Sequence, residues 1–139
     1  MSSELPQITS SFFLTADFRF DPHLVSARLP MSPTYVETKG DLRPSGRPPV
    51  VSSIWCFKCE DRRVQSLDAG LREVLDVVWP HRSAILDVMR GMNLTSYFQS
   101  CVRIHDLEYG VVHELLADTI QRMADLKAEW SLDLYDFTE

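Results

Sequence analysis

The chain has few of the residues from which cofactor and catalytic sites are usually recognised. Its five glycines are scattered over 139 residues, so it has no glycine-rich loop that could cradle a phosphate. Its four histidines are also dispersed, and none is paired at the spacing of metal ligands on one helix. We therefore predict no catalytic residues, no metal and no cofactor, and we expect that the protein is not an enzyme.

Cysteine is scarce as well, and three cysteines are an odd number that fits a reducing compartment better than a disulfide framework. Cys56 and Cys59 have the spacing of a redox or metal pair, but side chains three apart in a strand point to opposite faces. Cys101 and His105 share a strand face, yet four residues of strand span roughly 13 Å, too far for a nucleophile and its base. We interpret all three cysteines as structural.

Long apolar runs and clusters of basic residues are also missing. No apolar run approaches the roughly 18 residues of a membrane helix, and the N-terminus has neither the basic region nor the apolar stretch of a secretory signal. The net charge of -6 argues against a nucleic acid as the main partner. We expect a cytoplasmic protein that binds neither membranes nor nucleic acid.

What is present is the composition of a globular protein, with 45% hydrophobic and 24% charged residues. A chain of this length fits a single domain, here residues 1–139. Residues 1–9 are expected to be loosely ordered, and residues 30–50 form a long link that contains prolines. The first predicted elements are a strand at 11–20, a helix at 22–29, a short strand at 34–37 and a longer strand at 50–59. A helix at 67–79 follows, and then a second helix that begins after Pro80 and ends at Gly91. The last elements are a strand at 94–104, a helix with an apolar stripe from Val112 through Leu116, Ile120 and Met123 to Lys127, and a strand at 130–135.

The strands are apolar on one side and polar on the other, which predicts the α+β class. We expect one largely antiparallel β-sheet with helices packed on one face. The opposite face would be a solvated surface or a binding face. Its predicted residues are Phe13, Thr15, Asp17, Arg19, Tyr97, Gln99, Cys101, Arg103, His105, Asp133 and Tyr135.

The stretch 32–57 has no helix periodicity and ends in a strand that contains Trp55. With the last strand, 131–135, it resembles the bacterial family of domain of unknown function 4279, over roughly residues 11–137. The matching residues are Pro33, Thr34, Lys39, Gly40, Asp41, Gly46, Arg47 and Trp55. The chain departs from that family at residues 48–51, which stand where the family has a basic and glycine-rich segment just before the Trp. The resemblance implies a small cytosolic α+β domain without assigned catalysis, in a family with candidate immunity proteins beside toxin genes.

Negative charge is concentrated at the end of the chain. Residues 104–139 hold nine acidic side chains against only Arg122 and Lys127. They form a solvated surface or one that steers a basic partner. Our first hypothesis is a protein-binding domain of the immunity or antitoxin kind, monomeric or a homodimer through the open sheet face, that neutralises a basic toxin. The candidate partner-binding residues are Asp106, Glu108, Glu114, Asp118, Asp133, Tyr135, Tyr97 and Arg103.

The alternative hypothesis is a small-ligand-binding or enzymatic domain. Its pocket would lie beneath the loop 39–55, because pockets need a few convergent polar groups in an apolar wall. The candidate lining residues are Lys39, Asp41, Arg43, Arg47 and Trp55.

Overall fold

A six-stranded sheet organises the chain. The computed structural model describes residues 5–44, 46–60, 62–63, 66–106 and 110–138. The sheet order is β2-β3-β1-β5-β6, and the short β4 also pairs with β1. Every pairing is antiparallel except that of β5 with β6, which is parallel. The strands are β1 Gln7–Ala16, β2 Tyr35–Glu37, β3 Ser53–Lys58, β4 Arg62–Arg63, β5 Thr95–Ile104 and β6 Ala128–Asp136.

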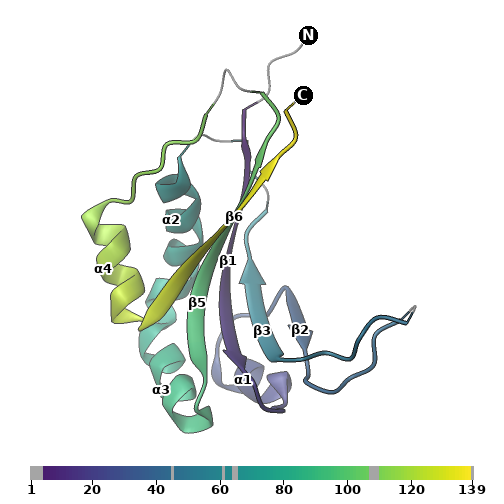
Figure 1. Ribbon diagram of the computed structural model, residues 1–139. Helices are drawn as coiled ribbons and strands as arrows, with labels where there is room; N and C mark the ends of the chain where they lie inside the picture. The colour runs from purple at the N-terminus through teal and green to yellow at the C-terminus, as the bar shows by residue number, and fades with distance from the viewer. Residues whose placement is uncertain (1–4, 45, 61, 64–65, 107–109, 139) are drawn as a thin grey trace.

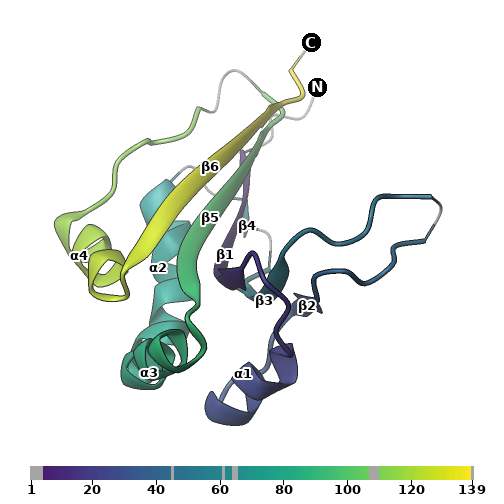
Figure 2. The ribbon, with the colours of Figure 1, turned by 60° about the horizontal axis from the view of Figure 1, so that its bottom comes forward.

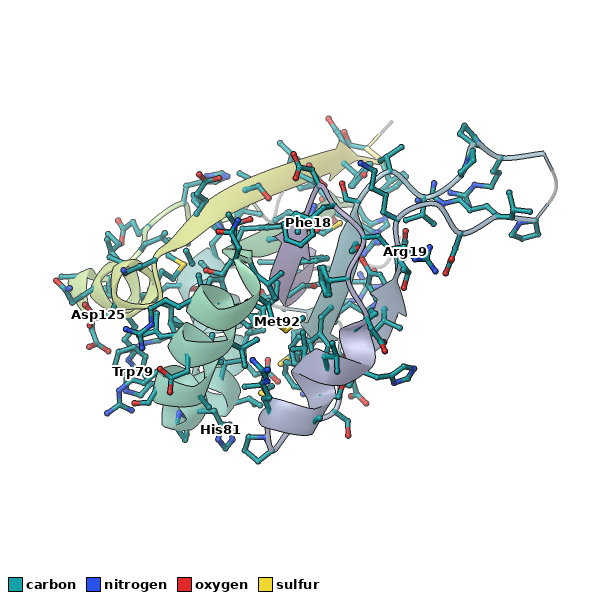
Figure 3. All side chains as sticks on the ribbon, turned by 90° about the horizontal axis from the view of Figure 1, so that it is seen from below. Phe18, Arg19, Trp79, His81, Met92 and Asp125 are labelled. Atoms are coloured by element: carbon teal, nitrogen blue, oxygen red, sulfur yellow. The ribbon has the colours of Figure 1, made fainter. Side chains whose placement is uncertain are left out.

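The helices lie on one side of this sheet and leave the other side open (Figures 1 and 3). The predicted α+β class and the largely antiparallel sheet with helices on one face are confirmed. None of the helices in the described part of the chain is long and apolar enough to cross a membrane. The helices are α1 Pro22–Arg28, α2 Leu67–Val78, α3 Arg82–Met92 and α4 Ala117–Asp125, with a 3₁₀ turn, η1 Trp79–His81, between α2 and α3.

The central strand β1 is buried from Ile8 to Leu14. It pairs with β3 and β4 along one edge and with β5 along the other, so side chains of neighbouring strands flank it on the open face while the helices cover the other face. Phe12 and Leu14 point to the helices and are fully buried in the main core. Gly70 of α2 lets that helix lie close to β1, since a Cβ there would come within 2.7 Å of the Ser10 hydroxyl oxygen. Helix α2 can therefore pack almost directly on the sheet backbone.

The stretch 32–57 is divided between the sheet and a projecting arm. Strands β2 and β3 pair with each other, and residues 42–44 and 46–49 extend away from the sheet (Figures 1 and 2). Gly40 has φ +90, and the backbone N–H of Asp41 donates to the Thr38 carbonyl at 3.1 Å, which forms a turn at the base of the arm. Trp55 faces the helices with no exposed surface, and its indole Nε1 donates to Ser26 Oγ at 3.1 Å.

The first predicted strand was displaced by four residues. The observed strand runs from Gln7 to Ala16, so residues 7–9 are not loosely ordered: Ile8 is buried against Leu67 and Val102. Asp17 and Arg19, predicted on the open face, lie beyond the end of the strand. The two-residue strand β4, for which no strand was predicted, forms because Arg62 and Arg63 pair with the start of β1; both residues are exposed.

The seven-residue α1 buries only Pro22 and Val25, and Leu24 is 52% exposed. Two predictions about the other helices were wrong. Helix α3 passes through Gly91 and ends at Asn93 in the left-handed region, φ 56. The stripe from Val112 to Lys127 does not form one buried face, because α4 begins at Ala117 and turns Thr119 and Met123 inward.

We expect Trp55→Ala to lower the free energy of unfolding by about 3–5 kcal/mol, because it leaves a large cavity in the core. Urea denaturation measures this value. Ser26→Ala is the matched control: it removes only the acceptor of the indole N–H, so we expect a loss of about 1 kcal/mol. Equal losses for the two variants would contradict the assignment of Trp55 as a core anchor.

Candidate functional site: the open face of the sheet

A row of aromatic rings crosses the open face. Phe13 of β1 stacks on Tyr97 of β5 with ring centroids 4.5 Å apart and planes 3° from parallel. Tyr35 of β2 meets the other edge of Phe13 at 6.3 Å in a T-shaped contact. The small Cys56 lies between β1 and β2 in the same row, since it is paired with both Phe13 and Tyr35. Large rings on β2, β1 and β5 therefore meet above it.

Beside this row the face is hollowed along β1. Thr9 and Ser11 form the floor because their short side chains stand between the longer ones of β3 and β5; both are 6% exposed. The hollow has a volume of about 260 Å³, and we call it the trough. Its lining residues are Thr9, Ser11, Phe13, Tyr35, Lys58, Gln99, Cys101 and Arg103.

Two cations stand on opposite sides of the trough. Lys58 lies beside Ser11 on β3, and Arg103 lies beside Gln7 on β5. Four residues along the strands and two strand spacings across place their Cα atoms about 17 Å apart. The trough therefore carries a positive charge on each side, which suits a negatively charged group lying along it.

Acidic groups border the same face on β6. Cys101 is paired with Asp133 and Arg103 with Tyr135. Gln99 Nε2 donates to an Asp133 carboxylate oxygen at 2.5 Å, which holds that carboxylate against β5. The face therefore changes from basic and hydroxyl-bearing over β1 to acidic at β6.

Burial changes the chemistry of two groups in the aromatic row. It raises the pKa of the Cys56 thiol from 9.0 to about 12, because the side chain has no exposed surface. Burial, and then the neighbouring Cys56 and Glu37, raise the pKa of Tyr35 from 10.0 to about 12. Both groups stay protonated at neutral pH, so Cys56 is not an activated nucleophile.

The predicted partner-binding residues do not form one surface. Tyr97, Arg103, Asp133 and Tyr135 lie together on the open face of β5 and β6. Asp118 begins α4 and pairs with Arg72 at 3.5 Å and Arg122 at 3.1 Å. Its charge is partly neutralised there. Of the other three predicted residues, Asp106 follows β5, Glu114 precedes α4, and Glu108 is outside the described residues.

The residues predicted beneath the loop 39–55 do not surround a common pocket. Trp55 is in the core, on the helix side of the sheet. Lys39 donates to the Asp17 carbonyl, Asp41 pairs with Arg19 at 3.2 Å, and Arg43 pairs with Glu37 at 2.9 Å. Arg47 is exposed on the arm. These contacts brace the base of the arm.

The trough residues Thr9, Ser11, Tyr35 and Lys58 were missed from the sequence. Thr9 was assigned to a loose terminus, and Ser11 and Lys58 were not placed on the open face. The alternation of β1 already puts Thr9 and Ser11 on the side of Phe13. Only the strand order puts Lys58 beside them.

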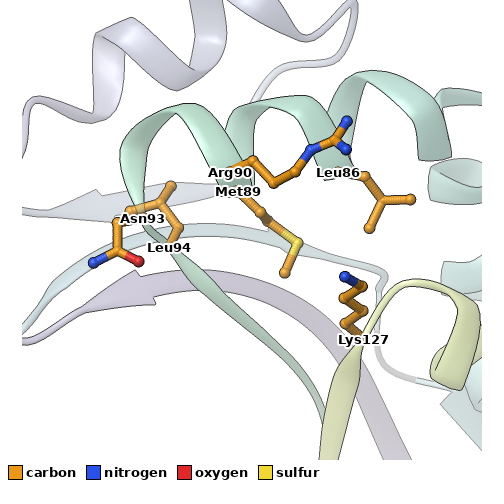
Figure 4. Close-up of a pocket in the computed structure, with 6 residues that line it drawn as sticks. All are labelled: Leu86, Met89, Arg90, Asn93, Leu94 and Lys127. Atoms are coloured by element: carbon orange, nitrogen blue, oxygen red, sulfur yellow. The ribbon is translucent and has the colours of Figure 1, made fainter.

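A second hollow of about 280 Å³ lies at the end of α3 (Figure 4). Its wall is apolar at Leu86, Met89 and Leu94, with Arg90 and Lys127 at its rim. Arg90 already pairs with Asp87, which leaves this hollow fewer polar groups than the trough. In the described part of the chain, no three His, Cys, Asp or Glu side chains converge on a point that could hold a metal ion.

Comparison with known protein families shows which family this chain is related to. The model of a domain of unknown function (DUF4279) matches residues 6–137. The chain belongs to this family. The match confirms the resemblance read from stretch 32–57 and extends to β1 and β6, so the trough and its acidic border lie within the family domain. No curated protein and no solved structure matches the chain significantly.

We expect stability to fall as the pH rises from about 9 toward 12. In that interval the folded chain keeps protons on Cys56 and Tyr35 that the unfolded chain releases, so deprotonation favours unfolding. Urea denaturation at a series of alkaline pH values measures the slope of the unfolding free energy. The double variant Cys56→Ala/Tyr35→Phe should have a shallower slope than the wild type, and an unchanged slope would contradict the assignment.

Proposed function

We propose that this member of the DUF4279 family is a non-enzymatic protein-binding domain of the immunity or antitoxin kind, which acts in the cytoplasm and neutralises a toxin. The observation that carries the proposal is the open sheet face, where the aromatic row closes one end of the trough and β6 adds an acidic border. Aromatic side chains on an uncovered sheet suit a protein partner, because such rings dominate the binding energy of protein interfaces.

The shape of the trough supports a segment of a protein partner. Lys58 and Arg103 lie on opposite sides of the trough, and an extended loop with two acidic groups would pair with both. The acidic border supports a partner that is basic beside that loop. Glu129 and Asp133 lie on the open side of β6, and no Lys or Arg occurs in that strand.

We expect Tyr97→Ala and Asp133→Lys each to weaken partner binding at least about tenfold, because one removes half of the ring stack and the other reverses a border charge. The measurement is co-expression with the product of the adjacent gene, followed by copurification, titration of the affinity and a growth-protection assay. Asp125→Lys is the matched control, since Asp125 is an exposed residue at the end of α4, away from the open face (Figure 3).

Two results would count against this function. The first is an absence of binding and protection at low salt, where steering by charge is strongest. The second is an equal loss of affinity for Asp133→Lys and Asp125→Lys, which would show that only the net charge of the chain is sensed.

A small anionic ligand in the trough is the second candidate function, favoured by Lys58 and Arg103 over the hydroxyl floor. This ligand site in the trough takes the place of the pocket that was expected beneath the loop 39–55. A metabolite with two separated acidic groups should raise the melting temperature, and Lys58→Ala and Arg103→Ala should each reduce that rise. Lys39→Ala, which removes a cation from the base of the arm, is the control and should leave the rise unchanged. If no compound in a panel of di- and tricarboxylates and phosphate esters raises the melting temperature, the small-ligand function is excluded and protein binding is the remaining candidate.

A further inference from the structure

Strand β6 forms a long free edge of the sheet. It has nine residues, whereas the opposite edge, β2, has three. Within the described ranges β6 pairs only with β5, and Figures 1 and 2 show it at the border of the sheet. Natural edges of this length are usually protected by charged side chains, above all Lys, by Pro or by a bulge. Ala128–Asp136 contains no Lys, Arg or Pro, and its charged side chains are the carboxylates Glu129, Asp133 and Asp136.

The backbone of β6 determines which residues offer hydrogen bonds to the outside. The N–H of Phe137 donates to the carbonyl of Ile104 in β5 at 2.8 Å. In a strand, successive residues turn their N–H and C=O groups to alternate sides. The odd-numbered residues of β6 therefore bond to β5, and the even-numbered ones present both groups to the free edge: Ala128, Trp130, Leu132, Leu134 and Asp136.

Except for Asp136, the side chains of these even-numbered residues form an apolar stripe on the helix side of the sheet. Trp130, Leu132 and Leu134 are 37%, 38% and 53% exposed. The helix layer thus leaves much of their surface in water, where it is available for burial against a partner. The acidic Glu129 and Asp133 lie on the other side of the strand.

The stripe is complementary to itself in an antiparallel arrangement. If Leu132 lies opposite its own copy, then Trp130 faces Leu134, Ser131 faces Asp133 and Glu129 faces Tyr135. The large apolar residues meet each other, Asp136 lies opposite the small Ala128, and no two carboxylates are directly opposite, a position that would be destabilising.

The two neighbouring registers lack this property. A shift of the twofold axis to Ser131 places Glu129 opposite Asp133, and a shift to Asp133 places that carboxylate opposite its own copy. Registers further away shorten the paired length. The residue pattern of β6 therefore selects a single register.

We propose that two copies of this chain pair antiparallel through β6, with the twofold axis at Leu132, into one continuous sheet. The paired even-numbered residues exchange about ten backbone hydrogen bonds. Because paired residues keep their faces, both open faces lie on the same side of the dimer. The proposal goes beyond the proposed function, since it uses the edge of the sheet and leaves each trough uncovered.

Sedimentation velocity over a concentration series tests the pairing. The wild type should form a dimer. Leu132→Lys should raise the dimer dissociation constant at least about tenfold, because it sets two ammonium groups across the axis. Leu42→Lys is the matched control, since Leu42 is 88% exposed on the arm, and it should dimerise like the wild type.

Two further variants keep the test independent of any folding defect. Leu132→Pro removes an N–H that points outward, so circular dichroism should show a folded monomer. At the exposed Ser131, the register predicts opposite effects of opposite charges: Ser131→Lys faces Asp133 of the second copy and should tighten the dimer about threefold or more, and Ser131→Glu should weaken it comparably.

Three results would overturn the proposal. A wild type that stays monomeric at every concentration would point to another occupant of the edge, such as an extended basic segment of a different protein. A dimer that survives Leu132→Lys and a folded Leu132→Pro would use another surface. Equal shifts from Ser131→Lys and Ser131→Glu would exclude this register.

Discussion

The position of β1 between β3 and β5 is the constraint on which the rest of the structure depends. Both neighbours pair with it along most of its length, so its side chains are buried on both faces of the sheet. On the helix side it provides Phe12 and Leu14 to the core, and α2 reaches it through Gly70. A strand buried in this way holds both the core and the floor of the open face in place.

The same strand explains why the open face is hollowed. Next to Phe13 on this face of β1 are Ser11 and Thr9, whose side chains are short. Ser11 lies between Lys58 and Gln99, and Thr9 lies beside Cys101. The described helices all lie on the opposite side (Figure 3), so none of them fills the space above these hydroxyl groups. The aromatic row closes the trough at one end, where Phe13 contacts both Tyr97 and Tyr35.

The parallel pairing of β5 with β6 has a different consequence. Parallel neighbours need a crossover, which here contains α4, and the chain returns to the sheet at its border instead of its centre. The acidic last quarter is divided by this path: Asp133 lies on the open face, whereas Asp118 pairs with Arg72 and Arg122 in the helix layer. The half-exposed apolar side chains of β6 follow from the same border position.

The sequence by itself determined the local elements and their faces. The two-residue period of β5 and the Asp21-Pro22 start of α1 are set by neighbours along the chain, where Asp21 accepts the N–H of His23. Only the tertiary structure decided that Lys58 joins Ser11, that Ile120 is exposed and that β6 is an edge. These properties depend on which distant segments become neighbours in the sheet. The apolar and polar alternation within one strand is the same whatever the order of the strands, so it cannot predict that order.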